Sequence, residues 1–257
     1  MTRLLPVRIV RPIVWFAAAS MITTVLHELT HAVVAYLLGV RSTLFSYFAH
    51  LDPTPAQAAS PRISLIRIAG PLFCLGLGAI AWMAYRRTRD SDLRLPLLYF
   101  TIFGIGTFFG NLMSIALVGD FSSVAVALGL PMGIRISIAA IGALLVAAIH
   151  FWGGRELVQW APAGVGRMGS MLGSVALPAL LGTAIVIIVN QPMPPAFTAA
   201  RLGEAAFWLF AAAGALATGG PALRSRPPVG VRWADAAALI LAILVVRLMA
   251  SGIALTP

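Results

Sequence analysis

Seven apolar stretches of about 18 to 27 residues recur along the 257-residue chain, and they constrain its fold more than any other feature. A transmembrane α-helix needs roughly 20 predominantly apolar residues to cross the hydrocarbon core of a bilayer. Helices suit this environment because every backbone polar group is hydrogen-bonded within the segment. The sequence therefore predicts an all-α fold, a polytopic transmembrane bundle of about seven helices. The predicted helices cover residues 12–39, 66–85, 96–119, 133–152, 171–190, 202–220 and 234–253.

The composition indicates a membrane protein and argues against a nucleic-acid-binding protein. Hydrophobic residues make up 60% of the chain and charged residues only 10%, and the mean hydropathy of +0.95 is well above that of soluble domains. The 18 basic residues are all arginine and the formal net charge is +10. Most of these arginines lie between apolar stretches, where they orient a protein in the bilayer and contact anionic headgroups. We expect an integral, multi-pass protein of a bacterial-type plasma membrane.

The connections add three expectations. The basic N-terminus and Ala17-Ala18-Ala19 resemble a signal peptide, but the apolar run continues to Leu38, which predicts a retained first helix. The longest connection, 40–65, contains three aromatic residues and is predicted to fold back into the interface as a hairpin. A cytoplasmic N-terminus puts 12 arginines on the inner side and 5 outside, which predicts an N-in, C-out orientation.

The motif with the clearest chemistry lies inside the first apolar stretch and reads His27-Glu28-Leu29-Thr30-His31. At 3.6 residues per turn, residues four apart lie about 40° from each other, so both imidazoles can face one metal ion. Glu28 lies about 100° from His27, where it can act as a general base without being a ligand. Ionisable residues at bilayer depth cost on the order of 2–3 kcal/mol each, so three of them together favour a metal site over a chance match.

A catalytic zinc ion needs a third protein ligand and one open position for water. Cys74 is the only cysteine, which excludes a cysteine-based zinc site. Asp120 is the favoured third ligand because it ends the third apolar stretch with no basic residue nearby. The alternative interpretation of Asp120 is an ordinary carboxylate in the first turn of the next loop. In that case Asp52 or His50 would be the next candidate for the third ligand. His50 and His150 are otherwise expected to be interfacial or packed.

Three features, in this order, resemble the site-2 protease family of intramembrane zinc metalloproteases. They are the His27 to His31 motif with its Leu38-Gly39-Val40 exit, the Ala69-Gly70-Pro71-Leu72 segment opening the second helix, and Asn111 followed by Asp120 in the third. The resemblance covers about residues 20–125. It implies a catalytic membrane core in residues 1–125 and leaves residues 126–257 as accessory transmembrane helices.

The resemblance also implies roles for individual residues. A three-helix catalytic core would hold Zn²⁺ through His27, His31 and Asp120. Glu28 would be the catalytic base, and Asn111 would lie near the substrate backbone or the oxyanion.

The third helix departs from the family pattern in three ways. Ser114 stands where the family usually has Pro, and Phe121 stands where it usually has Gly. The gap from Asn111 to Asp120 is nine residues, one more than the common form, and nine residues of ideal helix turn through about 180°. Both residues can face one metal only if the helix breaks, and Gly110 and Gly119 are the expected places.

These observations predict an intramembrane zinc metalloprotease that cleaves peptide bonds in or near the transmembrane segments of other membrane proteins. Its partners would be the lipid bilayer, a substrate with a transmembrane helix and, because no soluble domain is visible, an accessory membrane protein or a second copy of the chain. Two alternatives remain open. One is a catalytically inactive homologue that acts as a membrane scaffold, and the other is a transporter, since intramembrane His and carboxylates also serve proton relays.

Overall fold

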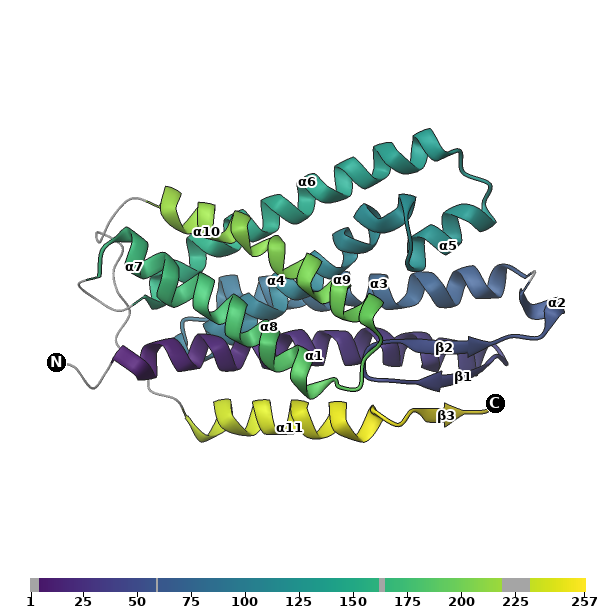
Figure 1. The fold of residues 1–257 in the computed structure, drawn as a ribbon, viewed down its shortest axis with the longest axis horizontal. Helices are drawn as coiled ribbons and strands as arrows, with labels where there is room; N and C mark the ends of the chain where they lie inside the picture. Colours follow the sequence, from purple (N-terminus) through teal and green to yellow (C-terminus); the bar gives the residue numbers. More distant parts are fainter. Residues whose placement is uncertain (1–4, 59, 162–164, 219–231) are drawn as a thin grey trace.

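The computed structural model describes residues 5–58, 60–161, 165–218 and 232–257, and its long helices run roughly along one axis (Figure 1). Within these residues, six segments are helical, long and apolar enough to cross a membrane. They overlap the first six predicted stretches and confirm that these stretches are helical and long and apolar enough to cross a membrane. The six are Ile9–Leu37, Pro61–Arg87, Asp92–Ala116, Met132–Trp160, Arg167–Val189 and Pro195–Ala217.

Several of these spans are built from more than one helix. The α-helices of the spans are α1 (Leu5–Leu37), α3 (Pro61–Arg87), α4 (Ser91–Met113), α6 (Met132–Leu157), α7 (Arg167–Met171), α8 (Leu177–Val189), α9 (Pro195–Ala206) and α10 (Trp208–Ala217). Short segments of other helical types extend or join them: η1 (Ser114–Ala116), η2 (Val158–Trp160) and the π-helical η3 (Leu172–Ala176). The seventh predicted stretch forms α11 (Trp233–Met249). Its 17 residues extend over roughly 26 Å at 1.5 Å per residue, slightly less than the thickness of a typical hydrocarbon core.

Helix α1 lies at the centre of the bundle and carries the predicted metal-binding motif. Ala17, Ala18 and Ala19 are completely buried, and small side chains at such positions let neighbouring helices approach closely. At the N-terminal end of α1, Arg11 pairs with Asp235 of α11 at 3.0 Å and donates a hydrogen bond to the backbone oxygen of Asp92 in α4. These contacts bring the starts of three helices together at one end of the bundle.

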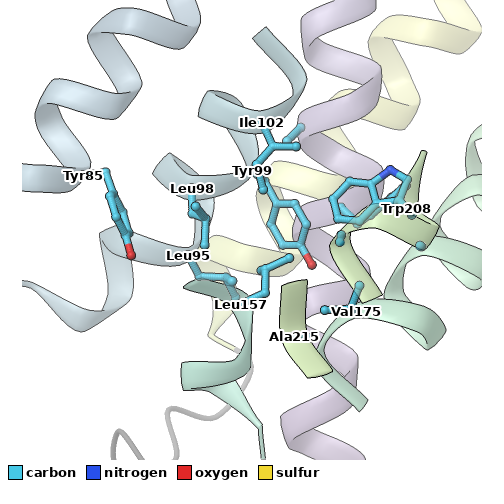
Figure 2. Packing of buried hydrophobic residues seen from close by; sticks show 13 residues of the cluster. Tyr85, Leu95, Leu98, Tyr99, Ile102, Leu157, Val175, Trp208 and Ala215 are labelled. Atoms are coloured by element: carbon cyan, nitrogen blue, oxygen red, sulfur yellow. The ribbon is translucent and has the colours of Figure 1, made fainter. Parts of the chain in front are cut away.

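Two hydrophobic clusters hold the later helices against α1. The larger joins α1, α3, α4, α6, η3, α8 and α10, and Figure 2 shows Tyr99 and Trp208 near its centre. The ring of Phe16 on α1 lies 4.8 Å from that of Trp208. The second cluster joins α1 to α8 and α11. Residues on both sides of position 125 therefore share the same packed interior.

A three-stranded antiparallel sheet closes the other end of the bundle (Figure 1). Strands β1 (Arg41–Leu44) and β2 (Ala49–Asp52) form the hairpin predicted in the 40–65 connection, followed by the short helix α2 (Pro55–Ala58). Strand β3 (Ile253–Leu255) pairs with the free side of β1. The chain is largely helical, which agrees with the predicted all-α class, but the sequence did not predict this small sheet, because the three residues of β3 pair with a strand that is distant in the sequence.

The third predicted helix, 96–119, does not continue to its predicted end. Helix α4 ends at Met113, η1 follows, and the chain turns at Gly119, whose φ of 111° favours glycine. A new short helix, α5 (Asp120–Ala127), then begins. The expected break therefore occurs, at Gly119, whereas Gly110 stays inside α4. Asp120 does not end a membrane helix, as the sequence suggested, but begins the next one.

Candidate metal centre

Three side chains from two helices meet near the sheet end of the bundle. The Nε2 atoms of His27 and His31 lie 3.0 Å apart, and Oδ2 of Asp120 lies 3.1 and 3.2 Å from them. The two imidazoles are buried, and the Asp120 side chain is 13% exposed. One ligand atom from each residue therefore points at a common position.

Local structure explains why these side chains meet. His27 and His31 lie one turn apart on α1 and project from one face, with their rings nearly perpendicular and 4.6 Å apart. Asp120 reaches them because α5 starts directly after the Gly119 turn. Phe121 holds that start in place, since it is buried and its ring packs edge-on against Phe108 at 5.6 Å. The bulky side chain of Phe121 thus anchors the helix that carries Asp120.

Helix α3 orients one ligand through its backbone. The ring nitrogen Nδ1 of His31 donates a 2.6 Å hydrogen bond to the carbonyl oxygen of Ile66. A carbonyl can only accept, so Nδ1 of His31 carries a proton. Nε2 either carries a second proton, which it donates to Asp120, or offers its lone pair to a metal ion at the common position. Metal-ligating histidines commonly have such a partner on their other nitrogen.

The same face of α3 makes room for both imidazoles at Gly70. A Cβ atom added there would lie 2.4 Å from Nε2 of His31 and 3.0 Å from Cε1 of His27. One turn further along α3, Sγ of the buried Cys74 lies 3.5 Å from Nδ1 of His27, on the side of the ring that faces away from Asp120. Positions 66, 70 and 74 thus support the ligands from a single helical face.

Glu28 lies beside these residues without joining them. It interacts electrostatically with His27, His31 and Asp120, and its carboxylate interacts with the backbone of Ala49 at the start of β2. Among the residues that the structure describes, the group of ligand atoms that converge consists of the two histidines and the aspartate. Glu28 is thus outside the converging ligand group, and its action as a base remains a prediction.

Asn111 lies against the turn that presents Asp120. Its Nδ2 donates to the backbone oxygen of Thr107 at 3.0 Å, and its Oδ1 would be 3.7 Å from a Cβ placed on Gly119. The hydroxyl of Ser114 donates to the backbone oxygen of Asn111. Asn111 is thus near the predicted centre, and its action on a substrate remains a prediction.

The alternative third ligands lie elsewhere. Asp52 is exposed and pairs with Arg41 across the hairpin at 3.1 Å, and His50 is exposed on β2. His150 is buried in α6, where it donates to the backbone oxygen of Val146 and packs edge-on against Trp208. His150 is thus packed, as the sequence predicted.

The donor set fits zinc. Four donors at about 2.0–2.1 Å in a tetrahedron lie roughly 3.3 Å from one another, close to the 3.0–3.2 Å between the three atoms here. Burial raises the pKa of the Asp120 carboxyl, but hydrogen bonds from His27 and His31 outweigh burial and hold that pKa well below its usual range. Two imidazole nitrogens and a carboxylate oxygen this close require a cation between them, either protons or a metal ion.

Sequence reasoning missed the supporting residues of α3. Arg67 was treated only as a topology signal, yet its Nη1 lies 3.4 Å from Oδ1 of Asp120. Cys74 was considered only as a ligand, and its contact with His27 was not foreseen. The spacing of residues 66, 70 and 74 marks one helical face, but nothing in the sequence shows that this face meets α1.

No protein-family model, curated protein or solved structure matches this chain.

Proposed function

We propose that this chain is an intramembrane zinc metalloprotease, a hydrolase that cleaves membrane proteins in or near their transmembrane segments. The observation that carries the proposal is the meeting of His27, His31 and Asp120 within 3.2 Å beside Glu28, in a chain with six helices able to cross a membrane among its described residues. Such polar clusters are expensive in a bilayer and are usually functional. In this proposal α11 is a seventh crossing, and α1, α3 and the α4–α5 segment form the catalytic core.

The residues of the site divide the chemistry between them. His27, His31 and Asp120 would hold Zn²⁺, which, when bound, polarises a peptide carbonyl and makes a water molecule more acidic. Glu28 accepts a proton from the attacking water and then delivers it to the leaving amine. Its place outside the ligand group leaves its carboxylate free for this proton transfer.

The substrate must offer an extended peptide bond, since an intact helix buries its carbonyls in its own hydrogen bonds. We propose that a transmembrane helix of another protein unwinds locally at the sheet end of the bundle. Asn111, next to the Gly119 turn, would bind the backbone of the unwound segment. An accessory membrane protein or a second copy of the chain would deliver the substrate.

The first prediction concerns zinc itself. The purified full-length chain is expected to contain about one zinc ion per molecule, because three protein donors converge on one position. His27→Ala removes one donor and is expected to reduce bound zinc nearly to zero. His50→Ala is the matched control, because it removes an exposed imidazole outside the site and should leave zinc unchanged. Elemental analysis after dialysis against a weak chelator measures the zinc content of wild type, His27→Ala and His50→Ala. Folded wild-type protein that cannot take up zinc would contradict the proposed function.

A second prediction concerns orientation. Helix α5, which begins at Asp120, lies at the same end of the bundle as α2 and the C-terminus (Figure 1). Of the 12 arginines assigned to the inner side, residues 3, 224 and 226 and the side chain of residue 8 lie outside the described part of the structure. The N-in orientation remains a prediction and places the centre near the non-cytoplasmic surface.

Cysteine labelling in intact cells tests this orientation. Ala56→Cys in α2 is expected to react with a membrane-impermeant maleimide, and Thr88→Cys, which directly follows α3 at the opposite end, is expected to react only after cell lysis. The native Cys74 is fully buried and provides an unlabelled background. The reverse pattern would show that the centre faces the cytoplasm.

A further inference from the structure

The two oxygens of the Asp120 carboxylate have different partners. Oδ2 faces both imidazoles, whereas Oδ1 accepts a hydrogen bond from Nη1 of Arg67 at 3.4 Å. One carboxylate is thus held between the metal position on one side and a guanidinium on the other. The two contacts fix which oxygen is presented to a metal ion.

Helix α3 determines where Arg67 lies. Arg67 directly follows Ile66, whose backbone oxygen holds His31, so one segment of α3 positions two of the three ligands. The Arg67 side chain is 35% exposed, but its Nε is buried without a hydrogen-bond partner. A buried, unpaired N–H is unfavourable, particularly in a membrane, and indicates that the side chain is held here for its contact with Asp120.

The contact matters because a carboxylate can bind a metal through one or both oxygens. A catalytic zinc site has three protein donors and one open position. If Oδ1 also reached the metal, His27, His31 and two Asp120 oxygens would make four donors and complete a tetrahedron. A guanidinium bound to Oδ1 opposes this change, because it attracts the oxygen away from the metal position.

We propose that Arg67 is a positioning residue that restricts Asp120 to coordination through Oδ2 and so keeps one position at the metal open for water. This inference rests on the proposed function and adds a residue to it. This role of Arg67 differs from a purely structural one. It affects the open position at the metal, whereas the affinity for the metal stays nearly unchanged.

Cobalt substitution tests the inference without relying on catalysis. The full-length protein in detergent is loaded with Co²⁺, whose visible absorption reports its ligands, and is titrated with imidazole, an uncharged probe of the open position. Arg67→Gln is expected to bind Co²⁺ about as well as wild type but to bind imidazole about 10-fold more weakly. Hydrolysis of a single-span test protein should fall by about 10- to 100-fold, the usual effect of losing a partner of a metal ligand.

Two further variants serve as controls. Arg67→Lys keeps a cation with N–H donors beside Oδ1 and is expected to bind imidazole nearly as well as wild type. Arg62→Gln removes an exposed arginine from the same helix and should behave as wild type.

Four results would overturn the inference. Imidazole binding by Arg67→Gln equal to wild type would exclude the positioning role while leaving the metal site intact. Loss of Co²⁺ by Arg67→Gln, or the same loss of imidazole binding in Arg67→Gln and Arg67→Lys, would indicate a general structural defect. If the wild-type protein bound no Co²⁺ at all, the proposed function itself would fail, and that result is distinct from the other three.

Discussion

Glu28→Gln is expected to retain zinc and to lose hydrolysis by on the order of 10²- to 10⁴-fold, the usual contribution of a general base. Glutamine has nearly the same size as glutamate and preserves hydrogen bonding, but it cannot accept a proton from water. Zinc should stay, because the converging ligand atoms belong to His27, His31 and Asp120. Glu28 interacts electrostatically with all three, so loss of its charge should change zinc affinity only modestly.

The measurement compares wild type and Glu28→Gln in proteoliposomes. Both are incubated with a panel of single-span membrane proteins, and bound zinc is determined in the same samples as cleavage. Glu204→Gln is a matched control, because it removes a carboxylate that is 63% exposed and lies away from the centre. Undiminished cleavage by zinc-loaded Glu28→Gln would remove Glu28 from the mechanism. Loss of zinc would instead make Glu28 a structural partner of the metal site.

Gly70→Ala is expected to weaken zinc binding by on the order of 100-fold, at the upper end of what residues supporting a metal site contribute. The added Cβ would lie 2.4 Å from Nε2 and 2.7 Å from Cε1 of His31, closer than such atoms approach in folded proteins. The imidazole cannot turn away without losing its hydrogen bond to the Ile66 oxygen, and the packed helices resist separation. The donor atom that should face the metal is therefore displaced by a single methyl group.

Gly76→Ala is the matched control for this substitution. Gly76 lies on the same helix, and a Cβ there would meet no atom within 4 Å. Alanine is the better helix former by roughly 1 kcal/mol, so Gly76→Ala should keep zinc and lose no stability. Zinc affinity and circular dichroism of both variants separate a local effect on the centre from unfolding. Wild-type zinc affinity in folded Gly70→Ala would show that the imidazoles do not lie against α3 as described.

Local sequence patterns were enough to predict the helices and the two histidines of the candidate metal centre. Membrane helices satisfy their own backbone hydrogen bonds, so length and hydropathy located six helices that are long and apolar enough to cross a membrane, and also the helix α11. His27 and His31 lie four residues apart in one helix, and helical geometry alone places them side by side. The sequence offered Gly110 and Gly119 as places for a break in the third helix, and the chain turns at Gly119, where a positive φ favours glycine.

Other features depended on contacts between segments distant in the sequence. Asp120 was a favoured ligand by elimination, but its approach to the histidines required α5 to fold back, with Phe121 packed against Phe108. Strand β3 could not be foreseen, because its three residues are stabilised only by pairing with β1.

What the sequence by itself determined about this protein is its long apolar helices and the i, i+4 pair of histidines. Tertiary structure alone decided which face of α3 meets that pair, and therefore that Ile66, Gly70 and Cys74 support the imidazoles while Arg67 binds Asp120. The physical reason is that hydropathy marks α3 as a membrane helix but does not specify its rotation about its own axis. That rotation is set by packing against α1 and α4, where small residues and the shape of neighbouring side chains select one arrangement.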